Sequence, residues 1–164
     1  MTTDLIDETR ASWQRLHPHL DTAPMATMGR ILRIARLATL FSDQLLAAHG
    51  LSRGEFDVLS AVRRSSVALT PSQLAKLLAA SNASITKRLV ALERAGLARR
   101  EHTSADRRVV TVVATALGVE RIDGALPAQL DLERALTGGL SAAQAAALET
   151  TLRGVLTECE GRAR

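Results

Sequence analysis

The stretch that decides the fold is residues 70–97, TPSQLAKLLAASNASITKRLVALERAGL. Residues 70–73 combine a capping box with proline at the first helical position, which predicts the start of a short helix. That helix ends near Ala80, and Ser81 or Asn82 provides the next start signal at once. Two helices joined by so tight a turn are typical of a helix-turn-helix.

The neighbouring segments extend this pair into a larger unit. Before it, a capping box at residues 52–55 and apolar residues at helical spacing predict a helix to about Arg64. After it, residues 97–100 are extended, residues 101–107 are polar and turn-like, and residues 108–114 are rich in β-branched side chains. We therefore predict a mainly α (α+β) fold, a winged helix-turn-helix whose wing is this hairpin.

Long helices are expected on both flanks. A short helix over residues 4–16 precedes one that runs from about residue 21 to Gly50. Another should span residues 115–136, interrupted by Gly124 and Pro127, and a last helix begins at residue 141. Such long apolar-striped helices in a small chain favour a dimer interface. The predicted division is 1–50 N-terminal helices, 51–114 winged helix-turn-helix, and 115–164 C-terminal dimerisation helices.

The charge distribution points to a polyanion. Residues 53–108 hold 11 basic and 5 acidic residues, a net +6, whereas the rest of the chain is net −2. The whole chain has one Trp, two Phe and no Tyr, too few rings for the base stacking that single-strand binders use. Duplex DNA is therefore the better candidate partner, although an arginine-rich solvated surface would give the same count.

The predicted architecture assigns physical roles to individual residues. The N-terminal part of the helix at 82–95 lies nearest the base edges, and the helix at 70 offers free N–H groups to phosphate. Arginines in the narrow hairpin can reach an adjacent minor groove. The expected DNA contacts are Ser72, Asn82, Ser84, Thr86, Lys87, Arg107 and Arg108. Alternatively, this is any small α+β domain with arginines on its surface.

Sequence patterns for other chemistry are missing. The four histidines share no metal-ligand spacing, and no nucleophile elbow, P-loop or dinucleotide fingerprint occurs. We therefore expect no metal, no cofactor and no enzyme activity. Cys159, the only cysteine, falls on an apolar stripe and reads as a structural thiol rather than a redox sensor. With no signal peptide and no membrane span, a cytoplasmic location is expected.

Residues 50–118 resemble the MarR family of transcriptional regulators. The matching stretches are GLSRGEFDVLSAVRR, LTPSQLAKLLAAS, ASITKRLVALERAGLARR and ADRRVVTVVATALG. The resemblance implies a homodimer, with each wing domain reading half of a palindromic operator, and most simply a repressor. It also implies that Ser81 joins the recognition-helix contacts, that Asp106 braces the wing arginines and that Arg108 enters the minor groove.

The N-terminal WQRLHPHLD and PMATMGRILRIARL resemble the urate-responsive branch of that family, the PecS and HucR type. The resemblance implies an effector pocket that uses a Trp, an Asp and an Arg. The candidates here are Trp13, Asp57 and Arg88, with Arg64 as a further cation. A carboxylate and a guanidinium beside an indole suit a flat anion with N–H donors, such as urate or another aromatic anion.

Several alternatives remain open for this pocket. Trp13 could instead be a core or dimer contact, and Arg88 could contact a phosphate. Asp57 lies in the first turns of its helix, where an acidic residue is favoured in any case. Without an effector pocket, the chain would be an effector-independent DNA-binding regulator, or a protein-interaction module on the same fold.

Overall fold

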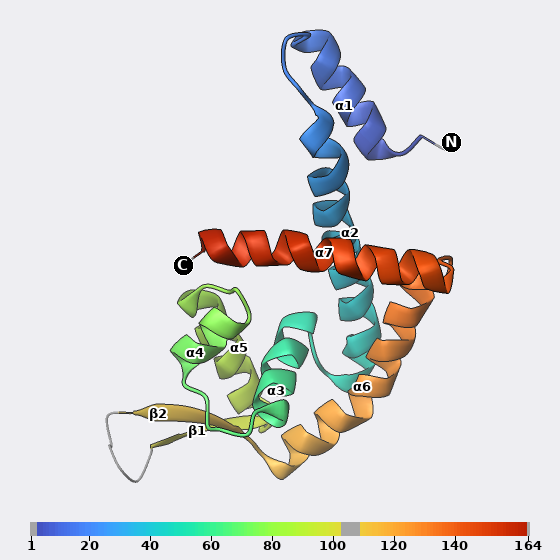
Figure 1. The fold of residues 1–164 in the computed structure, drawn as a ribbon. Coiled ribbons are helices and arrows are strands. Elements are labelled where there is room, and N and C mark those ends of the chain that lie inside the picture. Colours follow the sequence, from blue (N-terminus) through green and yellow to red (C-terminus); the bar gives the residue numbers. More distant parts are fainter. Residues whose placement is uncertain (1–2, 103–108, 164) are drawn as a thin grey trace.

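The computed structural model describes residues 3–102 and 109–163, and its ribbon is drawn in Figure 1. The elements in chain order are α1 (Leu5–Leu16), α2 (Ala23–Leu46), η1 (Ala47–His49), α3 (Arg53–Arg64), α4 (Pro71–Leu77), α5 (Asn82–Arg94), β1 (Ala98–His102), β2 (Val110–Ala114), α6 (Ala116–Thr137) and α7 (Ala142–Arg162). This order is the predicted winged helix-turn-helix between flanking helices.

Capping side chains set most helix starts. Ser52, Thr70 and Ser141 each close a capping box with the residue three positions later, at the start of α3, α4 and α7. Each box satisfies N–H groups that have no partner inside the helix. Gly96, in the left-handed region at φ 69°, ends the turn after α5, as its position in the sequence predicts.

The core lies in the lobe built from α3, α4, α5 and the hairpin, together with the adjoining ends of α2 and α6. Leu59, Leu74, Ile85 and Leu89 are fully buried there. The two strands are antiparallel, with Ala98 opposite Ala114. The loop before α4 also joins the edge of the sheet, because Val112 donates its N–H to the carbonyl of Leu69 at 2.8 Å.

The flanking helices extend away from the lobe, and few of their residues are buried. Figure 1 shows α2 rising away from it, with α1 folded back along the far end of α2, and α7 extending from the end of α6. Helix α7 contains no buried residue, and Cys159 on it is exposed. The predicted buried stripe of this helix therefore does not occur within one chain.

Two expectations about the helices need correction. Helix α6 is continuous from Ala116 to Thr137, although Gly124 and Pro127 predicted an interruption. The helix persists because Ile122, Ala125 and Gln129 are buried along one side, and that burial outweighs the backbone bond that proline removes. Helix α2 stops at Leu46, and one 3-10 turn completes the path to Gly50.

The N-terminal end of α6 is held against the turn that follows α5. Thr115 donates its N–H to the carbonyl of Leu97 at 3.0 Å and its hydroxyl to the carbonyl of Gly96 at 2.6 Å. Gly118 lies so close to Leu97 that a Cβ at this glycine would penetrate the Leu97 carbonyl oxygen. Helix α6 thus starts at a position fixed by backbone contact.

Helix α1 is attached to α2 by an ion-pair cluster. Arg30 bonds Asp4 and Asp7, each at 2.8 Å, and Ile6 packs against Gly29. Hydrogen bonding to the Arg30 guanidinium, with help from the Asp4 N–H, holds the pKa of Asp7 below its usual value. A lowered pKa in the folded state means that this attachment is present above the ordinary aspartate range and is lost as the pH falls below it.

Gly118→Ala should destabilise the protein by at least about 2 kcal/mol, because the new methyl group meets rigid backbone. Gly124→Ala on the same helix is the control: no atom lies within 4 Å of its Cβ position, and it should stabilise by about 0.5–1 kcal/mol. Thermal unfolding measures both, and equal effects would show that α6 does not start on this contact.

Arg30→Met should release α1, because it removes the cation that Asp4 and Asp7 share. Hydrogen exchange of the α1 amides should then rise several-fold. Arg33→Met is the matched control, an exposed arginine on the same helix that makes no ion pair among the described residues. In the unmodified protein the α1 protection should fall at pH below about 4, where the two carboxylates take up protons. Unchanged α1 exchange in Arg30→Met would refute this attachment.

Candidate DNA-reading surface and effector site

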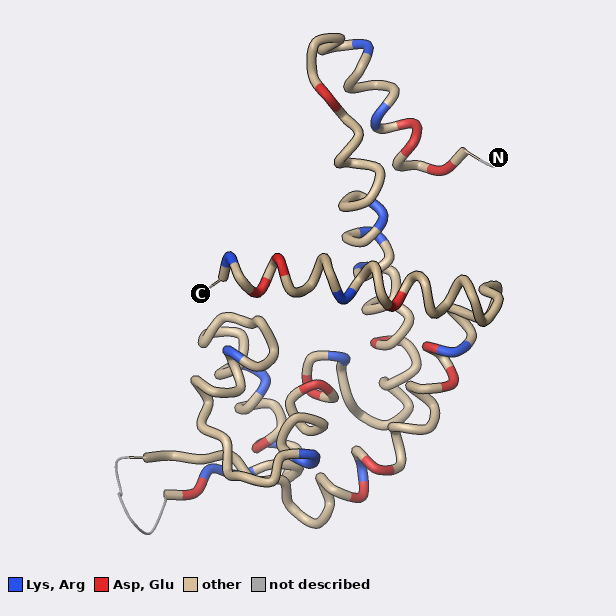
Figure 2. The backbone as a smooth tube through the Cα atoms, viewed as in Figure 1, with Lys and Arg blue, Asp and Glu red and all other residues tan. Residues whose placement is uncertain are grey.

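Helix α5 presents three different faces. Its buried face consists of Ile85, Leu89 and Leu92, which anchor the helix on α3 and α4. Outside this face, the side chains of Asn82, Thr86 and Lys87 are exposed, together with Ser72 at the start of α4. The predicted reading residues are therefore exposed on the lobe, and Figure 2 marks the basic positions along its backbone.

The starts of α4 and α5 border a groove of about 900 Å³. Ser72, Lys76 and Asn82 form one wall, and Glu160 and Ala163 at the end of α7 form the other. The hydroxyl oxygen of Ser81 accepts the N–H of Ser84 at 3.1 Å and so caps α5. Ser81 thus has a structural role in addition to any contact with a ligand.

The third face of α5 turns toward α3. Ser84 and Arg88 are half-buried, and Arg88 lies directly over Gly54 in the first turn of α3. A Cβ at Gly54 would come within 2.6 Å of the Arg88 Nε, so a larger residue here would force the end of the Arg88 side chain to move. Arg88 therefore belongs to the α3–α5 junction and not to the solvent face of α5.

Beside Gly54, Arg53 joins three helices. Its Nε bonds the Asp57 carboxylate at 2.9 Å within α3, and its Nη1 bonds the hydroxyl of buried Ser42 on α2 at 3.1 Å. The same Nη1 stands 3.9 Å from Glu133 on α6. Asp57, the predicted effector carboxylate, is thus already paired in the free protein.

The other two predicted pocket residues are placed apart from this cluster. The Arg64 guanidinium bonds the hydroxyl of Ser60 at 2.9 Å, at the opposite end of α3. Trp13 on α1 is 46% exposed and stacks on His17, with ring centroids 5.8 Å apart.

Helix α1 runs antiparallel to α2, so Trp13 lies near the start of α2. Arg10 bonds the carbonyl of Thr22, whereas Ser42 contacts the Asp57 cluster twenty residues further along. At 1.5 Å per residue this separation is ~30 Å. One chain alone therefore does not bring Trp13 to Asp57 and Arg88.

The predicted wing residues Asp106, Arg107 and Arg108 lie outside the described residues. At the base of the wing, Arg99 pairs with Glu101 at 2.6 Å and Arg100 with Glu93 at 2.9 Å. The hairpin is thereby tied to the last turn of α5.

Similar proteins of known family agree with this geometry. The sequence pattern that defines the MarR family matches residues 49–109. The transcriptional regulator PecS of Dickeya dadantii (strain 3937) is 32% identical over 150 residues, which cover 90% of this chain and 88% of PecS. The chain belongs to the MarR family. Its family and relatives are transcriptional regulators, not enzymes, and the PecS similarity supports the PecS-type branch.

Solved members of the MarR family share the fold. Wild-type apo MarR from E. coli, 27% identical, superposes with a TM-score of 0.67 over 78% of this chain and 96% of MarR. A mutant E. coli MarR complexed with operator DNA, 24% identical, gives a TM-score of 0.72 over 94% and 99%.

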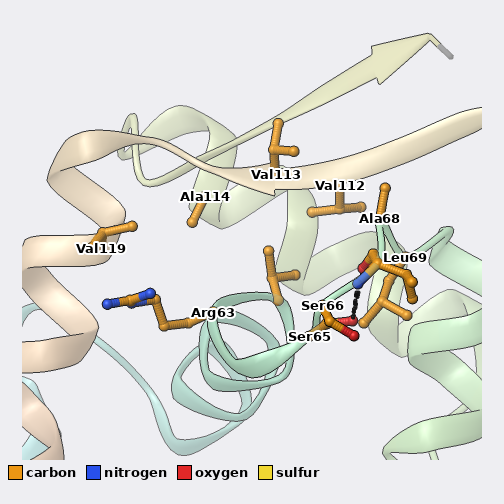
Figure 3. A pocket seen from close by; sticks show the side chains of 11 residues that line it. Arg63, Ser65, Ser66, Ala68, Leu69, Val112, Val113, Ala114 and Val119 are labelled. Atoms are coloured by element: carbon orange, nitrogen blue, oxygen red, sulfur yellow. Dashed lines mark hydrogen bonds between the residues drawn. The ribbon is translucent and has the colours of Figure 1, made fainter.

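A separate depression of about 320 Å³ lies between the end of α3, β2 and the start of α6 (Figure 3). Its cation, Arg63, is bonded to Asp123 of α6 at 3.0 Å, and the Ser65 hydroxyl is bonded to the backbone of Val67. Both polar groups are engaged locally, and none of the predicted effector residues lines this depression.

Sequence reasoning missed the cluster around Asp57. The spacing of Arg53 and Asp57, four residues apart on one helix, predicts an ion pair and could have been used. The contributions of Ser42, Gln129 and Glu133 depend on how α2 and α6 cross α3, which no local pattern encodes. Within the described ranges, no group of three or more metal-ligating side chains occurs and no helix is long and apolar enough to span a membrane.

Proposed function

We propose that this MarR-family regulator binds double-stranded DNA sequence-specifically as a homodimer on a palindromic operator, acts as a repressor, and is released by a small aromatic anion such as urate. The observation that carries the proposal is the exposed row Asn82, Thr86 and Lys87 on a helix whose opposite face is fully anchored in the core. Chromosomal DNA as the ligand implies a cytoplasmic protein.

Duplex DNA suits the surface because hydrogen bonds and charge, not stacking, are available there. Phe56 is the only aromatic residue of the 51–114 region and is buried. Asn can read adenine, Thr can contact a base edge or methyl group, and Lys can contact guanine or phosphate. Contacts to the DNA backbone would come from Ser72 and Ser81 at helix starts, from Ser84 beside them, and from Arg107 and Arg108 of the wing. Asp106 would brace the wing. A mutant E. coli MarR with the same fold was solved with operator DNA, which supports duplex DNA as the partner.

A homodimer is supported by apolar surface that one chain leaves uncovered. On α2, Leu32, Ile34 and Leu40 are at least half exposed, and on α7 no residue is buried. Burying such side chains contributes about 25 cal/mol per Å², so a second copy is the natural cover. A two-fold dimer presents two equivalent reading helices, which implies half-sites about 10 base pairs apart.

The effector site would lie where α3, α5 and the dimerisation helices meet. Asp57 accepts N–H groups of a flat ligand, and Arg88, which packs over Gly54, pairs with its anionic oxygen. Arg64, bonded to Ser60 at the other end of α3, would act as a more distant cation. Because Trp13 of the same chain lies ~30 Å away along α2, the indole wall must come from α1 of the second copy.

The reading surface is tested with charge-matched variants. Lys87→Ala should weaken binding to the operator and lower the salt slope by about one, whereas Thr86→Ala should change the preferred sequence. Arg15→Ala removes the same charge from α1 and should leave DNA binding unchanged. Mobility-shift titrations at several salt concentrations, using duplexes selected from random sequence, measure all three. Operator binding that is equal in all three variants would favour a protein-interaction module.

The shared effector site is tested by complementation. Trp13→Ala and Asp57→Ala should each abolish calorimetric heat with urate. A mixture, unfolded and refolded together, should regain up to one quarter of the wild-type sites, because half of the dimers then carry one intact site. A mixture without heat would overturn the arrangement across two chains. No heat with the unmodified protein would exclude urate as the ligand.

A further inference from the structure

Arg53 stands between two carboxylates on different helices. Its Nε is in contact with Asp57 of its own helix at 2.9 Å, whereas its Nη1 is 3.9 Å from Glu133 of α6. The first is a full hydrogen bond and the second is at the outer limit of an ion pair. The guanidinium therefore has a near partner and a second one within a short side-chain movement.

Arg53 is bonded to α2 through both its backbone and its side chain. Its N–H donates to the carboxylate of Asp43 at 2.6 Å, and its Nη1 donates to the hydroxyl of Ser42 at 3.1 Å. The side chain is 29% exposed and its Cζ lies 5.9 Å from the Phe56 ring centroid, so the guanidinium is not enclosed on all sides.

The α6 side of the cluster holds an unsatisfied acceptor. Gln129 is 2% exposed; its Nε2 donates to Glu133 at 2.9 Å, but its buried Oε1 has no hydrogen-bond partner among the described residues. A buried carbonyl oxygen without a donor favours the arrival of one. A guanidinium that moved onto Glu133 would bring several N–H donors to this pair.

We propose that Arg53 is the coupling residue of this regulator, which exchanges Asp57 for the Glu133–Gln129 pair of α6 when an effector occupies Asp57. The proposal rests on the effector function proposed above. An effector N–H group bonded to Asp57 competes with the guanidinium, which then pairs with Glu133 and draws the first turn of α3 toward α6.

The movement reaches the reading helix through Gly54. Gly54 follows Arg53 in the sequence, and the Arg88 side chain of α5 packs directly on it. A shift of the first turn of α3 would therefore displace the end of the Arg88 side chain and change how α5 packs on α3. The ion pair between Arg63 and Asp123 also connects α3 to α6, but it lies at the other end of α3 and takes no part in the exchange.

The exchange can be tested without any effector. Asp57→Ala removes the near partner and should weaken operator binding about 5-fold or more, as an effector would. Adding Glu133→Gln removes the alternative carboxylate and should restore affinity to within about 2-fold of the unmodified protein. Arg63→Met in the Asp57→Ala protein is the control and should restore nothing. Thermal unfolding of each variant separates these effects from loss of folding, because a second substitution on α6 does not repair a destabilised α3.

Additive effects of Asp57→Ala and Glu133→Gln on operator affinity would overturn the proposal. With urate as the probe, Glu133→Gln should retain the calorimetric heat but lose the release from DNA. Heat in the unmodified protein with unchanged release in Glu133→Gln would likewise overturn the coupling role. Absence of heat in the unmodified protein contradicts the urate effector alone, and the double-variant comparison then decides the role of Arg53.

Discussion

Leu59, Leu74 and Leu89 come from three helices and meet in a core that closes without any contribution from α1 or α7. This core fixes which side of α5 faces outward, because Leu89 and its neighbours use the opposite side. It also leaves the long flanking helices with apolar side chains and nothing to cover them in one chain. The reading surface and the need for a partner thus have the same physical origin.

Polar contacts join the core to the flanking helices beside the apolar contacts of Leu46, Ile122 and Ala125. Arg121 donates to the carbonyl of His49 at 2.6 Å, Arg63 pairs with Asp123, and Arg53 bonds Ser42. Polar contacts of this kind can be exchanged for one another at little net cost, whereas a packed apolar junction cannot. The polar contacts can therefore rearrange while the apolar part of the junction stays packed.

Local sequence signals predicted the lobe well. Its helices begin at capping residues, and its hairpin is marked by the change from helical periodicity to a run of β-branched residues. The continuity of α6 was not predictable, since it depends on Ile122 and Gln129 being buried against other helices. The proposed effector site was only partly predictable for a related reason. Asp57 and Arg88 share the α3–α5 junction, but the path of α1 along α2, which separates Trp13 from them, is a tertiary contact centred on Arg30.

The energetics of the Arg53 cluster suit a switch better than a rigid brace. Asp57 and Glu133 are 32% and 52% exposed, and pairs at such positions contribute about 0–1 kcal/mol each. Exchanging one for the other therefore changes the free energy little, so both arrangements lie within reach of a ligand. An effector needs a preference of only about 1–3 kcal/mol for one arrangement to weaken DNA binding 5–150-fold. Breaking a fully buried ion pair at this junction would cost far more free energy, and binding of a small anion would not supply it.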